Sequence, residues 1–97
     1  MKVYLTAIVK ARPEHRDTVL SVLLNMVEQT RKEEDCQLYD LHNSTDDRNV
    51  FFFYEIWESQ EALDAHNQQP YIQEFVKIAG ELLQEPPVII KADILFQ

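Results

Sequence analysis

Hydrophobic and polar positions along the chain predict alternating strands and helices. Residues 3–9 are mostly β-branched, aromatic or otherwise apolar, which predicts a first strand. Apolar residues then recur at helical spacing (Val19, Leu20, Leu23, Met26 and Val27), opposite a polar face. Pro13 suits the first position of a helix, so we expect a long helix over residues 13–33.

A hairpin is predicted in the middle of the chain. Residues 36–44 alternate moderately between apolar and polar and indicate a second strand, and residues 45–49 are rich in turn-forming types. Residues 50–57, with the sequence VFFFYEIW, form the strongest strand pattern in the chain. This third strand is apolar on both faces, so we expect it at the centre of a sheet.

The C-terminal half predicts a helix in two parts and a last strand. Ser59 is a suitable N-cap for a short helix that runs to about Asn67, and Pro70 interrupts the helical pattern. Residues 71–84 then carry a second apolar stripe, which is made of Ile72, Phe75, Val76, Ala79, Leu82 and Leu83. Pro86 and Pro87 end this helix, and residues 88–96 indicate a fourth strand.

The resulting order, β-α-β-β-α-β, predicts an α+β protein of the ferredoxin-like class: an antiparallel sheet with helices on one face. The chain has no internal repeat or linker, so we expect one domain over residues 1–97. Both faces of the third strand are apolar, yet no helix remains for the second face of the sheet. A second copy of the chain, packed sheet to sheet as a homodimer, is the simplest cover.

Charge and composition narrow the expected partners. The formal net charge is −8, so neither nucleic acid nor an anionic membrane surface is an expected partner. The single glycine argues against phosphate-binding loops, and the lone Cys36 excludes a disulfide framework within one chain. The chain shows no secretion signal pattern and no apolar run of about 18 residues, so a cytoplasmic location is expected.

Two titratable residues stand on apolar faces. Glu55 shares one face of the third strand with Phe51, Phe53 and Trp57, where burial would raise the pKa of its carboxyl group. It is either a general acid or base, or a structural carboxylate that accepts hydrogen bonds from backbone or arginine. His66 lies on the inward face of the short helix, either as a proton shuttle or as a structural histidine bonded to a backbone carbonyl.

Other chemistry finds less support. His15, His42 and His66 lie on different elements without metal-binding spacing, so neither a metal site nor a bound cofactor is expected. Tyr39, on one face of the second strand, and Thr6, on one face of the first, could each line a cavity between sheet and helices. Such a cavity, apolar with a few polar groups, would suit a flat aromatic or otherwise neutral small molecule.

The stretch YEIWESQEALDAHNQQPYIQEF resembles the motif of the antibiotic biosynthesis monooxygenase (ABM) family. The matching positions are Glu55, Trp57, Ser59, Glu61, Leu63, His66, Pro70 and Phe75, joined upstream by Glu33, Glu34, Cys36, Tyr39 and Leu41. The resemblance implies a dimeric α+β barrel, a pocket in each subunit, and a C-terminal strand that reaches toward the partner. Tyr71 replaces a frequent histidine, and the residues typical of the haem-degrading branch are missing, which makes haem degradation improbable.

The resemblance leaves three hypotheses open. The first is a cofactor-independent monooxygenase that uses O₂ on a quinol-like or polyketide-like aromatic, with His66 and Tyr39 as catalytic residues. Its substrate-binding residues would be Trp57, Tyr71, Phe75, Thr6 and Glu55. The second is a non-oxidative isomerase that processes a small signal molecule, and the third is a dimer that binds a small molecule without catalysis.

Overall fold

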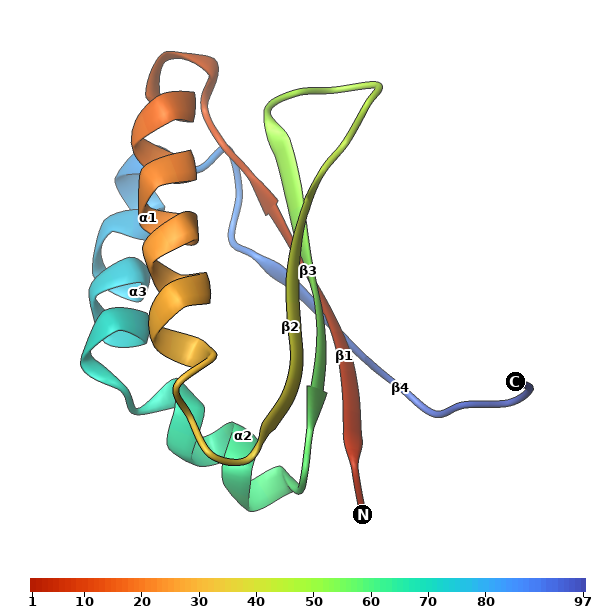
Figure 1. Ribbon diagram of the computed structural model, residues 1–97. Helices are drawn as coiled ribbons and strands as arrows, with labels where there is room; N and C mark the ends of the chain where they lie inside the picture. The colour runs from red at the N-terminus through yellow and green to blue at the C-terminus, as the bar shows by residue number, and fades with distance from the viewer.

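The computed structural model describes residues 1–97 and has the predicted order of elements, with the second helix in two parts (Figure 1). The elements are β1 (Val3–Lys10), a 3₁₀ turn η1 (Pro13–His15), α1 (Arg16–Thr30), β2 (Cys36–Asn43), β3 (Val50–Trp57), α2 (Gln60–Asn67), α3 (Pro70–Leu82) and β4 (Val88–Ala92). The ferredoxin-like prediction is confirmed.

The four strands form one antiparallel sheet in the order β2-β3-β1-β4. The apolar strand β3 therefore lies inside the sheet, as its pattern predicts. Helices α1 and α3 cover one face of the sheet, and α2 closes its lower end (Figure 1). No helix covers the other face.

The core lies between the helices and the inner face of the sheet. Alternate residues of β1 and β3 point into it, because side chains of a strand alternate between its faces. The buried strand residues are Leu5, Ala7, Val9, Tyr39, Phe51, Phe53, Glu55 and Trp57. Helix α1 adds Val19, Leu23 and Met26 at helical spacing, and α3 adds Ile72 and Phe75.

The structure corrects the bounds of two elements and the expected burial of one residue. The helix predicted over residues 13–33 begins as the turn η1, and α1 ends at Thr30. The strand predicted over residues 88–96 ends at Ala92, because Ala92 pairs with Tyr4 and β1 begins only one residue earlier. Val76, expected within the apolar stripe of α3, leaves 61% of its surface exposed.

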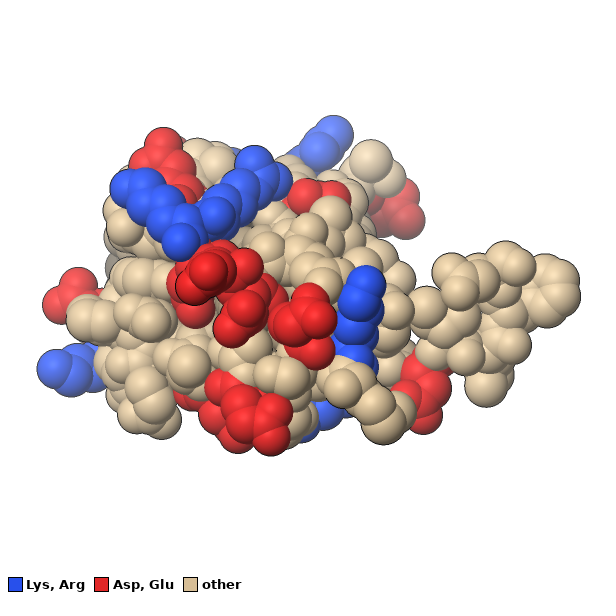
Figure 2. Space-filling view, turned by 60° about the horizontal axis from the view of Figure 1, so that its bottom comes forward, with Lys and Arg blue, Asp and Glu red and all other residues tan.

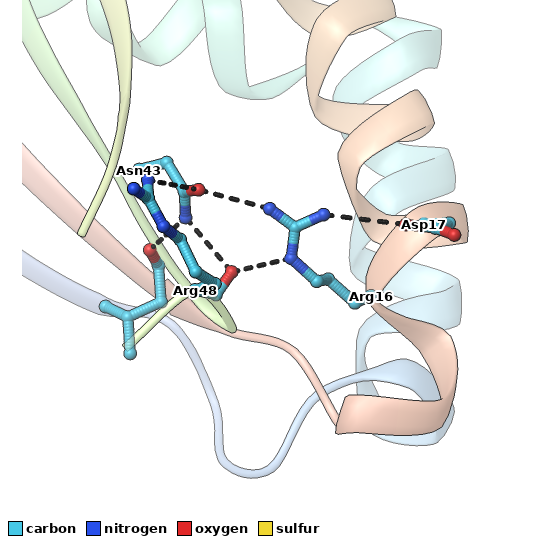
Figure 3. A network of polar contacts seen from close by, with 5 residues as sticks. Arg16, Asp17, Asn43 and Arg48 are labelled. Atoms are coloured by element: carbon cyan, nitrogen blue, oxygen red, sulfur yellow. Dashed lines mark hydrogen bonds and ion pairs between the residues drawn. The ribbon is translucent and has the colours of Figure 1, made fainter. Parts of the chain in front are cut away.

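Arg16 fastens the β2–β3 hairpin to the start of α1 (Figure 3). Its Nε donates to the carbonyl oxygen of Arg48 at 2.8 Å, and a terminal nitrogen donates to Asn43 Oδ1 at 3.1 Å. The guanidinium carbon also lies 5.3 Å from the ring centroid of Phe51. The loop that joins the two strands is thereby held at the end of the molecule opposite α2.

The outer face of the sheet and the C-terminal segment expose apolar side chains. Tyr54, Val88 and Ile90 leave between 40% and 49% of their surface exposed, and Leu95 and Phe96 are almost fully exposed. The segment after β4 points away from the body of the molecule (Figure 1). None of the helices has the length and apolar character needed to cross a membrane.

Candidate active site

A cavity of about 440 Å³ lies between the inner face of the sheet and the helices α2 and α3. Strand side chains such as Ala7, Phe53 and Glu55 form its floor, and helix side chains such as His66 and Phe75 face them. Of its 18 lining residues, 11 are hydrophobic. Its size and apolar character are those of a small-molecule site.

Glu55 is a buried carboxyl group at this floor, with 4% of its surface exposed. The indole nitrogen of Trp57 donates to its Oε1 at 2.8 Å. Burial raises the pKa of Glu55 to about 7, and the hydrogen bond from Trp57 only partly opposes this effect. Glu55 can therefore hold or release a proton close to neutral pH. Its donor is an indole rather than the backbone or arginine donor that the sequence suggested.

His66 lies at the end of α2 and is also buried, with 4% of its surface exposed. Its Nδ1 is 2.7 Å from Oε2 of Glu33, which lies in the loop between α1 and β2. The same oxygen accepts a short hydrogen bond from the hydroxyl of Tyr71, at the start of α3. Burial lowers the pKa of His66, although Glu33 opposes this shift.

Aromatic rings enclose the imidazole of His66 and hold its orientation. The Trp57 ring centroid is 4.4 Å from the imidazole centroid, and the Tyr39 centroid is 5.5 Å away. Burial, reinforced by the charge of Glu55, raises the pKa of Tyr39 far above its ordinary value. The Tyr39 hydroxyl, which lies beside the side chain of Thr30, therefore stays protonated.

Two polar atoms of the cavity lining remain without a hydrogen bond. They are Oε2 of Glu55 and Nε2 of His66, and both residues line the cavity. Tyr39 also lines the cavity, but its hydroxyl lies beside the side chain of Thr30 on α1. The site thus offers a carboxyl group and an imidazole to one ligand.

Polar side chains from α2 and β4 mark the mouth of the cavity. Lys91 Nζ donates to Gln60 Oε1 at 2.9 Å, and Gln60 Nε2 donates to Asp64 Oδ1 at 2.9 Å. All three residues are exposed and line the cavity. Asp and Glu side chains gather on this end of the molecule (Figure 2). Its negative surface favours the entry of neutral ligands over anionic ones.

The structure brings most of the predicted site residues together. Tyr39, Glu55, His66 and Phe75 line the cavity. Trp57 is fully buried behind it and acts as the donor to Glu55, and Tyr71 acts as a donor to Glu33; neither lines the cavity.

The expected position of Thr6 was wrong. The expectation placed this side chain in a cavity between sheet and helices, but its neighbours Leu5 and Ala7 line the cavity instead. Thr6 points to the outer face, opposite Tyr54 of β3 and Ile90 of β4 in the strand register. Side chains alternate between the two faces of β1, so the sequence predicts which residues share a face. It does not predict which of the two faces points toward the helices.

Glu33 is the residue of the site that reasoning from sequence alone missed. It matched a family motif, but nothing in its spacing pointed to His66, which follows 33 residues later. Glu33 and His66 meet only because the loop after α1 packs against α2 in the folded protein. In the described residues 1–97, no group of three or more His, Cys, Asp or Glu side chains is placed to hold a metal ion.

Fold and site together define a small ferredoxin-like α+β protein with a ligand-sized apolar cavity that carries acid–base groups. A family model described as "Antibiotic biosynthesis monooxygenase" matches residues 3–78. The chain therefore belongs to the ABM family.

Individual relatives agree with this assignment. The chain is 32% identical over 92 residues to the Bacillus subtilis protein "Putative monooxygenase YcnE", covering 95% of this chain and 97% of that protein. The solved structure of Rv0793 from Mycobacterium tuberculosis superposes with a TM-score of 0.92 at 30% identity, covering 100% of this chain and 98% of that one. A Synechocystis relative, sll1783, is 32% identical over 81 residues, and this chain spans only 55% of its length.

Proposed function

We propose that this protein is a cofactor-independent monooxygenase that acts on a small electron-rich aromatic, such as a hydroquinone or a polyketide-like phenol. The observation that carries the proposal is the pair of unbonded polar atoms, Oε2 of Glu55 and Nε2 of His66, whose residues line a mostly apolar cavity. Relatives named as putative monooxygenases support it. The cavity size and the acidic surface near its mouth favour a neutral, flat substrate.

The first step removes a proton from the substrate. Nε2 of His66 accepts the proton of a phenolic hydroxyl, and the protonated carboxyl group of Glu55 donates a hydrogen bond to the phenolate oxygen that forms. Because the cavity is apolar, it weakens competing hydration of this anion. The phenolate is then electron-rich enough to pass one electron to O₂.

The second step joins the oxygen to the ring. The substrate radical and superoxide combine to form a carbon–oxygen bond, and the distal peroxide oxygen takes a proton from the imidazolium of His66. The peroxide then loses water, because its O–O bond and the C–H bond at the same carbon break and leave a carbonyl group. Glu55, with its pKa raised to about 7, can donate the proton that turns the departing hydroxide into water. Nε2 of His66 accepts the proton of the C–H bond, and transfer of this proton to Glu55 restores both groups. The net change is hydroquinone plus O₂ to hydroxyquinone plus water.

Isotope labelling tests the proposed reaction. The purified protein is incubated with a panel of hydroquinones and phenols under ¹⁸O₂, and the products are analysed by mass spectrometry before the label exchanges with water. We expect one labelled oxygen atom in the product of at least one substrate. Unlabelled products, or no product in the whole panel, would contradict the proposal.

A second candidate function rests on the pairing of a base and an acid in one cavity. His66 and the protonated form of Glu55 could move a proton between two atoms of a hydroxycarbonyl substrate, which is an isomerisation without O₂. Turnover that continues under argon would favour this isomerase over the monooxygenase. Ligand binding without turnover under either gas would favour a binding protein without catalysis.

A further inference from the structure

We propose that Glu33 is a positioning residue that sets His66 as a base toward the cavity, and that Tyr71 holds Glu33 in place for this task. The expected effect of Glu33 on reaction rates rests on the proposed function. Glu33 does not line the cavity, so it would not contact a substrate bound there. Its action on the reaction would pass through the imidazole alone.

The hydrogen bond between Glu33 and His66 selects one tautomer of the imidazole. A carboxylate oxygen only accepts, so the Nδ1 atom 2.7 Å from Oε2 of Glu33 must carry the proton. In the neutral ring the proton is then absent from Nε2, whose lone pair is left for the cavity. The opposite tautomer would place an N–H at the cavity and leave the base unavailable.

Tyr71 restrains the carboxylate itself. Its hydroxyl donates to the same Oε2 atom that accepts from His66, so two donors from α2 and α3 fix one oxygen of Glu33. The side chain of Glu33 keeps only 15% of its surface exposed, which limits competition from water. The two hydrogen bonds hold the carboxylate of Glu33 in place, although Glu33 lies in a loop. A histidine that acts as a base needs such a fixed hydrogen-bond partner to keep its orientation.

The charged and titratable groups around His66 come from every neighbouring element. Glu33 lies on the loop after α1, Tyr39 on β2, Glu55 on β3, and Tyr71 on α3. Cys36, at the start of β2, lies near Glu33. Burial raises the pKa of Cys36 to about 11 and raises the pKa values of both tyrosines further, so these three stay neutral near pH 7. Glu33 is therefore the group whose hydrogen bond and charge hold the pKa of His66 up against burial.

Nuclear magnetic resonance of the imidazole nitrogens tests the assignment without any substrate. We expect the wild type to show the Nδ1–H tautomer above the pKa of His66. In Glu33→Gln, the side-chain amide can either accept or donate, so the tautomers mix and the titration of His66 moves to lower pH. The matched control is Glu34→Gln, which removes an exposed carboxylate from the same loop and should leave the His66 signals unchanged.

Tyr71→Phe provides a second variant that keeps the Glu33 carboxylate. We expect it to retain the Nδ1–H tautomer but to broaden the His66 signals, because Glu33 loses one of its two donors. A wild type with the Nε2–H tautomer, or a Glu33→Gln titration equal to that of the wild type, would overturn the proposal. Amide spectra of each variant establish that it is folded.

Kinetics separates this proposal from the proposed function. If a substrate is found, Glu33→Gln should lower kcat about 10- to 1000-fold with little change in KM, and should move the acid limb of the pH–rate profile to lower pH. Should no substrate react with O₂, the proposed function fails while the nuclear magnetic resonance result still decides the role of Glu33. A normal kcat in Glu33→Gln with an altered tautomer would remove the catalytic part of the proposal.

Discussion

At the scale of single residues, the site depends on two buried titratable groups whose pKa values shift in opposite directions. Burial raises the pKa of the Glu55 carboxyl and lowers the pKa of the His66 imidazole, because it disfavours the charged form of each. Near neutral pH the imidazole therefore favours its uncharged form, and the carboxyl group is present in both its protonated and its ionised forms. A protonated carboxyl and an unprotonated imidazole are the pair that proton transfer to and from one ligand requires.

Glu55 should also make the stability of the protein depend on pH. Its pKa is higher in the folded chain (about 7) than its ordinary value of 4.5, so the folded state binds the proton more tightly. The stabilisation is complete below pH 4.5 and is lost as the pH rises through 7. Relative to Glu55→Gln, the wild type should lose roughly 3 kcal/mol of unfolding free energy over this range.

Urea unfolding at several pH values between 4 and 8 measures this effect as the difference between Glu55→Gln and the wild type. Comparing the two chains cancels the titration of His66, which acts in the opposite direction. Glu81→Gln removes an exposed carboxylate on α3 and serves as the control. A difference that stays constant across the pH range would show that the pKa of Glu55 is not raised.

Residue patterns predicted which side chains are buried better than they predicted their partners. The alternation of β3 placed Glu55 with the aromatic side chains, and the helical spacing placed His66 inward; both placements are confirmed. The contact of His66 with Glu33 joins residues 33 positions apart, and no periodicity reports such a contact. The predicted position of the Thr6 side chain was wrong for a related reason, since alternation does not say which face of β1 is the inner one.

At the scale of elements, α2 positions the histidine, and its first turn is capped by Ser59. The Ser59 hydroxyl accepts from the backbone nitrogen of Ala62 at 3.1 Å, as its place in the sequence predicts. A two-residue break separates α2 from α3, which begins with Pro70 at its first position. The break lets α2 lie across the lower end of the sheet, where His66 reaches the cavity.

Loss of this cap should destabilise α2 and with it the site. We expect Ser59→Ala to lower the free energy of unfolding by about 1 kcal/mol, because the backbone nitrogen of Ala62 loses its acceptor. The measurement is urea unfolding at pH 7, with Ser21→Ala on the exposed face of α1 as the control. Equal stabilities of the two variants would contradict the capping role.

Element boundaries show where a sequence pattern stops being informative. The apolar residues after Ala92 continue the composition of a strand, but β1 offers them no further partner because it begins at Val3. Strand length is set by the neighbouring strand as much as by the residues themselves. The same holds at the end of α1, where the loop turns away after Thr30 toward Glu33 and α2.

At the scale of the whole molecule, the uncovered face of the sheet is the main unsatisfied surface. We propose that a second copy of the chain covers it, because Tyr54, Val88 and Ile90 expose apolar surface on strands β3 and β4. Burial of this face against its own copy would stabilise a chain of only 97 residues.

Light scattering during size-exclusion chromatography tests this assembly. We expect the wild type to have twice the chain mass of 11.5 kDa, and the double variant Tyr54→Lys with Ile90→Lys to have the mass of one chain. Leu24→Lys changes an exposed apolar residue on α1 and should leave the mass of the wild type unchanged. A wild type with the mass of one chain at micromolar concentration would contradict the proposed homodimer.

In the proposed reaction, His66 is the base that activates a phenolic substrate for reaction with O₂. The most direct measurement is the rate of oxygen uptake with the most reactive hydroquinone of the panel, for wild type, His66→Gln and His15→Gln. We expect His66→Gln to lower kcat by about 10²- to 10⁴-fold, while His15→Gln, on the turn η1, keeps the wild-type rate. Oxygen uptake by His66→Gln at the wild-type rate would contradict the role of His66 as the base.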